Sequence, residues 1–365
     1  MSIADPKSLL AVERNKTENP VEVLKQLMVN TTPRLFSSRI TGTGSAFPQK
    51  RLTNHDLSAS IDTSDEWIQE RTGIRERRIA NPQDPNELNS SLALKAATQA
   101  LEMAGKKPED IDQIIYGTCT PDTLIPSTAC WLQMKLGAQN ASAMDLNAAC
   151  SGFVYSLSVA DQFIRTGAVK TSLVVGADVL SSMTNWEDRT SCILFGDGAG
   201  AVIVEQAPAD AESRILSSHL KSDGTLWDLF QIPAGGSKLE VTPEVFEKKL
   251  HKMQMKGKEI FKSAVRTLAD YALEAVSANG LQLSDVDWVI PHQANLRIIE
   301  AVAKRLEIPM EKVLVNIDRY GNTSSATCVT ALDEAVRDGR IQKGQIVLLD
   351  VFGAGLTFGS LIMRW

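Results

Sequence analysis

One cysteine of the chain stands among small residues at the start of a helix-like pattern. Cys150 lies in "NAACSGF", and Phe153, Val154 and Leu157 follow at the spacing of one helix face. A thiol at a helix N-terminus meets unpaired backbone N–H groups and the positive end of the helix dipole, which both favour the thiolate. The pattern therefore indicates a nucleophile presented at a turn. By itself, however, a cysteine among alanines is more typical of a small buried core residue.

Two further polar residues stand where a strand or a loop meets a helix. His292, in "IPHQANLRII", ends a strand-like run, and a neutral imidazole there can donate or accept a hydrogen bond and polarise a carbonyl group. Asn322, in "DRYGNTSSATCVTAL", precedes a helical pattern, and its amide can donate to a developing oxyanion. The alternatives are a structural histidine and an ordinary helix N-cap.

The elements that must position these residues alternate between strand-like and helix-like segments, which is typical of an α/β fold with buried strands. A helix is expected over 89–105, with Asn at its start and Gly at its end. Strands are expected at 113–118, 172–178, 201–206, 288–292 and 345–353.

The chain also contains two similar halves. "DIDQIIYG" (110–117) resembles "DVDWVIPH" (285–292) at an offset of 285 − 110 = 175, and the segments around Arg165 and Arg337 resemble each other at 337 − 165 = 172. The second offset pairs Cys150 with Asn322, which predicts two related helices with these residues at their N-termini, on either side of one crevice. His292, at the carboxyl end of a strand, would reach the same crevice, where α/β sheets place ligands.

The composition excludes several classes of protein. The 365 residues are 43% hydrophobic and 22% charged, and a net charge of −6 gives no support to nucleic-acid binding. Five cysteines without CxxC pairs argue against a zinc site or a disulfide framework and favour a reducing, cytoplasmic setting. No run approaches the roughly 18 apolar residues of a membrane span. The acidic segment 1–34 has no long apolar run, which argues against a signal peptide.

Five motifs in order, "DTSDEWIQERTGIRERRIA", "NAACSGF", "LFGDGAGA", "PHQANLRII" and "RYGNTSSA", carry a family resemblance. From about residue 36 to the end, the chain resembles the β-ketoacyl-acyl-carrier-protein synthase III family of the thiolase superfamily. The resemblance implies a thiolase-like five-layered αβαβα fold made of two duplicated halves, usually a homodimer. We divide the chain into a loosely held extension (1–34), a half with Cys150 (35–207), and a half with His292 and Asn322 (208–365).

The resemblance implies a decarboxylating condensation that uses no cofactor and no metal. Cys150 would take an acyl group from a coenzyme A thioester. Malonyl-acyl-carrier protein would then lose CO2, and its enolate would attack the acyl-enzyme to give a 3-oxoacyl product that starts fatty acid biosynthesis. His292 and Asn322 would hydrogen-bond the thioester carbonyl as the enolate forms. The backbone N–H groups of Cys150 and Ala354 would bind the oxyanion of acyl transfer.

The family's coenzyme A contacts fall on matching positions of this sequence. Trp67 and Arg189 would hold the adenine between them, with Thr63 and Arg71 at the nearby nucleotide and phosphate contacts. Without the surrounding motif, Trp67 would be interpreted as a buried core aromatic residue.

Other positions match the family's tunnel and the surface around it. Gly257 and Asn295 match the lining of the pantetheine tunnel, and Lys262 and Arg297 match basic positions where an acidic carrier protein docks. A solvated lysine on a helix face is the ordinary alternative for Lys262. Ile125 stands where phenylalanine often ends the acyl pocket across the dimer interface, which predicts room for a primer longer or bulkier than acetyl.

Two departures from the family pattern affect the entrance and the oxyanion site. Ala354 replaces a usual glycine in "VFGAGLTFGS", and the stretch 234–255 is longer than in the shorter members, which predicts an added helix bordering the entrance. Other branches of the superfamily fit less well: a degradative thiolase needs a second cysteine in that turn, and elongating synthases use a second histidine where Asn322 stands. A specialised relative in secondary metabolism keeps the same triad, and a non-catalytic scaffold would not need it.

Overall fold

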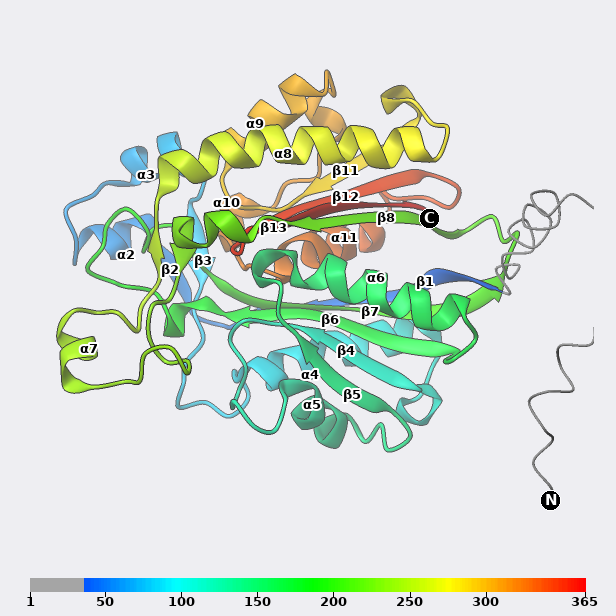
Figure 1. Ribbon diagram of the computed structural model, residues 1–365, viewed down its shortest axis with the longest axis horizontal. Helices are drawn as coiled ribbons and strands as arrows, with labels where there is room; N and C mark the ends of the chain where they lie inside the picture. Colours follow the sequence, from blue (N-terminus) through cyan, green and yellow to red (C-terminus); the bar gives the residue numbers. More distant parts are fainter. Residues whose placement is uncertain (1–35) are drawn as a thin grey trace, which may run out of the picture.

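Two β-sheets, with helices between them and on their outer faces, make up residues 36–365, the part of the chain that the computed structural model describes (Figure 1). The predicted extension over 1–34 lies outside the described residues. The first sheet has the strand order β1-β7-β6-β4-β5 and the second β11-β12-β13-β8. The strands of the first are β1 (Phe36–Ala46), β4 (Gln113–Gly117), β5 (Ser142–Leu146), β6 (Thr171–Val179) and β7 (Asp197–Pro208); those of the second are β8 (Arg214–Ser222), β11 (Trp288–Pro291), β12 (Ile346–Gly353) and β13 (Thr357–Arg364).

The helices form three layers around these sheets (Figure 1). The outer face of the first sheet is covered by α4 (Asn89–Ala104) and α5 (Thr128–Leu136). Between the sheets lie α6 (Gly152–Arg165) and α11 (Ala326–Arg337), and the second sheet is covered by α8 (Gly257–Ala278) and α9 (Leu296–Arg305). This order confirms the expected five-layered αβαβα fold, and every expected strand falls on an observed one.

Short elements surround the end of the molecule where these strands finish. The four short helices are α2 (Asn54–Ser58), α3 (Asp65–Thr72), α7 (Pro243–Glu247) and α10 (Ile317–Tyr320). Two small ribbons pair β2 (Arg51–Thr53) with β3 (Glu76–Arg78), and β9 (Phe230–Gln231) with β10 (Gln254–Met255). The helix predicted within 234–255 is α7.

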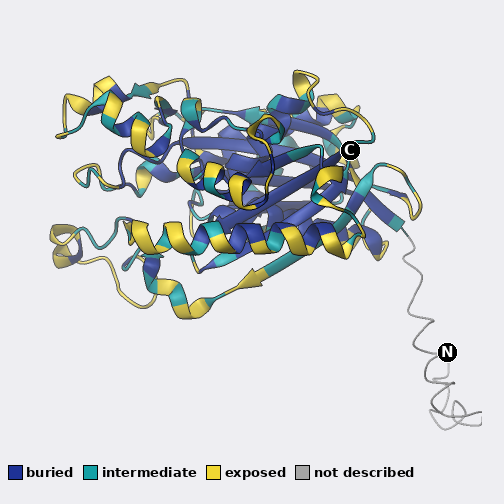
Figure 2. Ribbon diagram, turned by 90° about the horizontal axis from the view of Figure 1, so that it is seen from above, coloured by how far each residue is buried: buried dark blue, intermediate teal, exposed yellow. Residues whose placement is uncertain are grey.

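Burial on both faces explains why the central strands are continuously apolar. In β6, Val174 packs on Phe153 and Leu157 of α6, while Leu173 and Val175 face the alanine-rich side of α4. Figure 2 shows the strands as buried and the outer helices as exposed along one side. The strand order and these two apolar clusters fix the first sheet between α4 and the central helices.

Close packing of α4 on β1 depends on glycine. A Cβ atom added to Gly42 would lie 2.1 Å from the carbonyl oxygen of Ala100, and one added to Gly44 would lie 2.1 Å from that of Ala96. Only residues without a side chain permit this approach of strand and helix backbones. The helix begins at Asn89 with Leu88 as N-cap, so the expected Asn cap is wrong, whereas the expected glycine at its end, Gly105, has φ 64°.

The duplication is visible in the register of the strands. The pair Gln113–Ser172 in the first sheet and the pair Trp288–Val347 in the second share one offset, since 288 − 113 = 175 and 347 − 172 = 175. The carboxylate of Asp112 accepts from the N–H of Thr171 at 3.0 Å, and Asp287 repeats this contact in the second half with the N–H of Ile346. The shared strand order and register confirm two duplicated halves, while their division at 207 and 208 stays a prediction.

The second offset, 172, holds only near the ends of the central helices. The ion pairs Asp161–Arg165 and Asp333–Arg337 are related by it. The chain between helix and strand is three residues longer in the second half, so the strands return to 175. Cys150 and Asn322, which precede α6 and α11, are related by the same offset of 172 as these ion pairs, which agrees with their predicted pairing.

Candidate active site

Cys150 lies in a turn that is held by the second half of the chain. After β5 the chain passes through Ala149, with φ 47°, and a 3-10 turn (Ala149–Ser151) into α6. The Thr357 hydroxyl donates to the Ala148 carbonyl at 2.7 Å, and a Cβ added to Gly353 would lie 2.8 Å from the N atom of Cys150. The glycine-rich turn between β12 and β13 therefore packs directly on the cysteine's backbone.

The thiol of Cys150 is buried, with 7% of the residue exposed. Its Sγ accepts a hydrogen bond from the Ser324 hydroxyl at 3.5 Å. Burial raises the pKa of this thiol to about 12, and the hydrogen bond from Ser324 acts in the opposite direction. Loss of solvent therefore opposes the stabilisation of the thiolate that is expected at the helix start.

His292 follows β11 directly, as the sequence predicts. Its backbone N–H donates to the Asp350 carbonyl at 2.8 Å, and its Nδ1 atom lies 2.8 Å from the Thr327 hydroxyl oxygen. The ring is 4% exposed, and burial lowers the pKa of His292 to about 3. The imidazole is therefore neutral at neutral pH and carries a single N–H.

Asn322 belongs to a loop that pairs with the segment before β7. Its N–H donates to Leu194 at 2.8 Å, and its carbonyl accepts from Gly196 at 3.0 Å. Helix α11 begins four residues later, with Ser325 as N-cap, so the expected position at a helix N-terminus is wrong. The Oδ1 atom of Asn322 accepts from the Ser324 N–H at 2.8 Å, which leaves the Nδ2 group to donate into the pocket.

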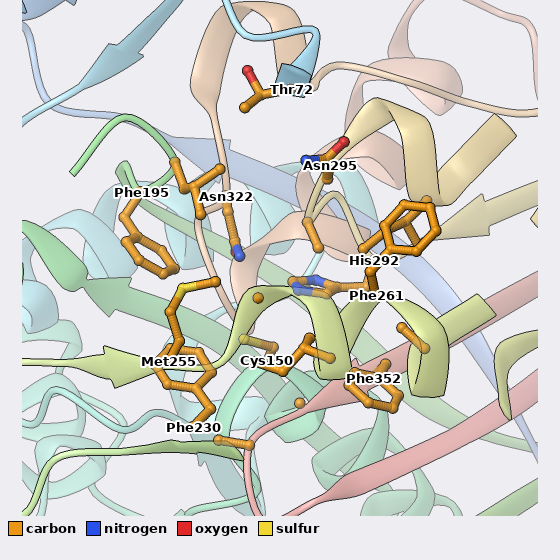
Figure 3. Close-up of a pocket in the computed structure, with 18 of the residues that line it drawn as sticks. Thr72, Cys150, Phe195, Phe230, Met255, Phe261, His292, Asn295, Asn322 and Phe352 are labelled. Carbon is orange, nitrogen blue, oxygen red and sulfur yellow. The ribbon is translucent and has the colours of Figure 1, made fainter. Parts of the chain in front are cut away.

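The three residues converge at the inner end of one pocket of about 380 Å³ (Figure 3). Its walls are mainly apolar and come from both halves of the chain. Met255, which ends the longer stretch 234–255, contributes to the wall, whereas no residue of α7 lines the pocket. The predicted site residues that line the pocket are Trp67, Arg71, Cys150, Gly257, His292, Asn295, Asn322 and Ala354.

Two guanidinium groups stack on the Trp67 ring at the outer end of the pocket. Arg71 and Arg189 each place Cζ 4.4 Å from the ring centroid, and Arg189 also forms an ion pair with Asp62 at 3.0 Å. An adenine between Trp67 and Arg189 needs a separation of about 7 Å, two van der Waals contacts. Arg189 must therefore move aside before a base can enter.

The remaining predicted residues lie around this pocket rather than in its lining. Thr63 has a buried hydroxyl without a hydrogen-bond partner among the described residues. Lys262 and Arg297 are exposed on α8 and α9. Ile125 is 89% exposed on the loop before α5 and does not line the pocket within this chain.

Asn295 connects helices α3 and α9 beside the pocket. Its Oδ1 caps α9 by accepting from the Arg297 N–H at 2.9 Å, and its Nδ2 donates to the Arg71 carbonyl at 3.0 Å. The residue thus holds the start of α9 against the end of α3. This geometry connects the predicted pantetheine contact to the predicted phosphate contact.

Sequence reasoning missed two hydroxyl groups that contact the predicted triad. Ser324 contacts Cys150 and Asn322, and Thr327 contacts His292. Both lie in the stretch "DRYGNTSSATCVTAL" that contains Asn322, but which triad member each contacts depends on the fold at the start of α11. Within residues 36–365 no three His, Cys, Asp or Glu side chains gather as a metal site would need. No helix in that range could cross a membrane.

Models of one protein family match two parts of the chain. Residues 144–224 match 3-oxoacyl-[acyl-carrier-protein] synthase III, and 276–365 match the C-terminal part of the same synthase. A β-ketoacyl-[acyl-carrier-protein] synthase III of Xanthomonas euvesicatoria is 54% identical over 330 residues, 90% of this chain and 98% of the relative. The chain belongs to the β-ketoacyl-acyl-carrier-protein synthase III family.

Solved structures agree with this membership. The synthase III of Aquifex aeolicus is 44% identical, with a TM-score of 0.82 over 90% of this chain and all of that one. A priming β-ketosynthase of the R1128 polyketide pathway is 34% identical, with a TM-score of 0.83 over 91% of this chain and 97% of that one. Family membership makes the chain an acyltransferase of the condensing type.

Proposed function

We propose that the chain condenses the acyl group of an acyl-CoA with malonyl-acyl-carrier protein and so begins fatty acid synthesis. The observation that carries this proposal is the meeting of Cys150, His292 and Asn322 at the closed end of an apolar pocket. That arrangement fits a thioester group, and the apolar walls of the pocket suit a pantetheine arm. The higher identity to the Xanthomonas synthase than to the polyketide enzyme supports the primary over the specialised role.

Acyl transfer is the first half-reaction of the proposal. The Cys150 sulfur attacks the acyl-CoA carbonyl, coenzyme A leaves as the thiol, and the thiol proton of Cys150 balances the exchange. The backbone N–H groups of Cys150 and Ala354 bind the oxyanion of the tetrahedral intermediate. Ala354 lines the pocket next to Gly353, which packs on the backbone of Cys150.

Decarboxylation and condensation follow at the same cysteine. Malonyl-acyl-carrier protein loses CO2, and the negative charge moves onto the thioester oxygen, where His292 and Asn322 donate hydrogen bonds. The enolate carbon then attacks the acyl-enzyme, and the released Cys150 thiolate takes a proton. Purified chain given acyl-CoA and malonyl-acyl-carrier protein should release CO2 and 3-oxoacyl-acyl-carrier protein in equal amounts. Release of CO2 without the longer product would contradict a condensing role.

The Trp67 stack supports coenzyme A binding at the pocket mouth, with Arg189, Arg71 and Thr63 around it. Replacing Trp67 by alanine removes the aromatic face for adenine, so we expect the KM for acyl-CoA to rise by roughly tenfold. The kcat should change little, because Trp67 does not contact the reacting thioester. Initial rates over a range of acyl-CoA measure this. Trp227→Ala, an exposed tryptophan outside the pocket lining, is the matched control.

An exposed apolar surface supports a homodimer. The strand β5 is an edge of the first sheet, and Met144 on it is 37% exposed. Beside it, Leu124, Ile125 and Met134 are 85%, 89% and 61% exposed. Monomeric proteins rarely expose such an apolar patch beside an unpaired edge strand. We propose that a second copy covers it and that Ile125 ends the partner's acyl pocket.

A charge placed in this patch tests the homodimer. Met134→Glu should convert a dimer into a monomer, because association would bury an unpaired carboxylate at a cost of several kcal/mol. Light scattering after size exclusion measures the mass. Met310→Glu, at a methionine of another surface that is 36% exposed, should stay dimeric. A native chain that elutes as a monomer would refute the proposal.

Two parts of the proposal concern the surroundings of the enzyme. Lys262 and Arg297 are exposed on the helices that border the pocket, which supports docking of an acidic carrier protein there. Cys119, Cys130, Cys150, Cys192 and Cys328 are all free thiols, which supports a reducing, cytoplasmic location.

A further inference from the structure

Thr327 contacts the one ring nitrogen of His292 that does not face the pocket. It lies in the first turn of α11 and is 1% exposed. Its hydroxyl oxygen is 2.8 Å from Nδ1 of His292 and 3.0 Å from the carbonyl oxygen of Ser324. The imidazole lines the pocket beside Cys150 (Figure 3). Whether Nδ1 carries the proton therefore determines whether Nε2 accepts or donates a hydrogen bond to a substrate.

The Thr327 hydroxyl has one hydrogen and two possible acceptors, Nδ1 of His292 and the carbonyl oxygen of Ser324. If it donates to Ser324, then Nδ1 must carry the imidazole proton, and Nε2 points a lone pair at the pocket. If it donates to Nδ1, then Nε2 carries the proton and can donate. The Ser324 carbonyl already accepts the Thr327 backbone N–H at 3.2 Å, whereas Nδ1 has no other partner among the described residues. Both arrangements pair these groups, but only the second leaves Nε2 with a proton to donate beside the amide of Asn322.

We propose that the Thr327 hydroxyl donates to Nδ1 and holds His292 in the neutral tautomer with its proton on Nε2. Thr327 is then a positioning residue, since it acts on substrate through the imidazole. The loop before α11 and the first turn of that helix orient both donors: the Ser324 N–H fixes the amide of Asn322, and Thr327 fixes the ring of His292. This inference rests on the proposed function, in which both groups donate to the thioester oxygen of the malonyl substrate.

The tautomer of His292 should affect decarboxylation but not acyl transfer. A histidine with its proton on Nδ1 would place a lone pair against the developing enolate oxygen and oppose decarboxylation. Acyl transfer depends on the Cys150 sulfur and backbone N–H groups, which do not use Nε2. Loss of the Thr327 hydroxyl should thus slow CO2 release and leave acylation nearly intact.

The tautomer can be observed without any activity. In ¹⁵N spectra of histidine-labelled native chain, Nδ1 of His292 should show the shift of an unprotonated ring nitrogen and Nε2 that of a protonated one. The chain has four histidines, and loss of a signal pair in His292→Gln assigns the residue. A native spectrum with the proton on Nδ1 overturns the proposal, whether or not the chain condenses acyl groups. An inactive chain with the expected tautomer would instead refute the proposed function.

Variants test the effect on the reaction. Thr327→Val keeps the shape of the side chain and should lower malonyl decarboxylation by roughly ten- to a hundredfold, with acylation of Cys150 within about twofold of native. Thr327→Ser should restore most of the rate. Thr330→Val removes a buried hydroxyl one turn further along α11 that contacts only the Thr327 carbonyl, and should leave both rates unchanged. Equal losses in both half-reactions, or no rescue by serine, would contradict the positioning role.

Discussion

Replacement of Cys150 by alanine abolishes uptake of an acyl group from acyl-CoA and lowers condensation by at least about a thousandfold. The reason is that the sulfur forms the covalent intermediate, and no other thiol lines the pocket. Intact-mass measurement after mixing native chain with acetyl-, butyryl- and longer acyl-CoAs should show one added acyl group. The variant should show none. If Cys150→Ala gains the same masses, the nucleophile is misassigned.

A second buried cysteine provides the matched control. Cys328 is 1% exposed in α11, and burial raises the pKa of its thiol well above the ordinary value. It resembles Cys150 in burial but lies outside the pocket lining, so Cys328→Ala should still be acylated. Running the same acyl-CoAs in order of length also measures the acyl pocket. If Ile125 leaves the expected space, primers longer or bulkier than acetyl will label Cys150 at comparable rates.

The fold could be predicted from the sequence because its strands are buried on both faces. Mainly apolar runs at 172–178 and 345–353 predict central strands between two layers of helices. The duplication could also be predicted, since Asp112 and Asp287 accept the same backbone hydrogen bond in the two halves. Two offsets were found because three additional residues after α11 shift the following strand from 172 to 175, while Cys150 and Asn322 before the helices stay at 172.

The sequence indicated which residues form the candidate site, but it did not indicate their protonation or their contacts. The motifs around Cys150, His292 and Asn322 identify polar residues at the ends of elements, and the fold brings those ends together. The raised pKa of the Cys150 thiol and the lowered pKa of the His292 imidazole follow from burial, which sequence spacing does not measure. Stacking of Arg189 on Trp67 likewise depends on how two distant loops meet.

His292→Ala and Asn322→Ala should each suppress CO2 release from malonyl-acyl-carrier protein by roughly a hundred- to a thousandfold, while acylation of Cys150 falls far less. Each variant removes one donor from the oxygen that gains charge during decarboxylation. In the proposed acyl transfer the corresponding charge would be bound by the backbone N–H groups of Cys150 and Ala354, which both variants retain. Release of ¹⁴CO2 and intact mass measure the two half-reactions separately.

The substitution Asn322→Asp distinguishes a donor role from a structural role better than Asn322→Ala does. Asn322→Asp keeps the size of the side chain and the acceptor for the Ser324 N–H but replaces the donating Nδ2 by an oxygen. Because that oxygen faces the pocket, it would repel the enolate, and decarboxylation should fall at least as far as in Asn322→Ala. A structural role for Asn322 predicts the opposite order, with aspartate closer to native. Variants that lose acylation and keep CO2 release would overturn the assigned division between the cysteine and its two partners.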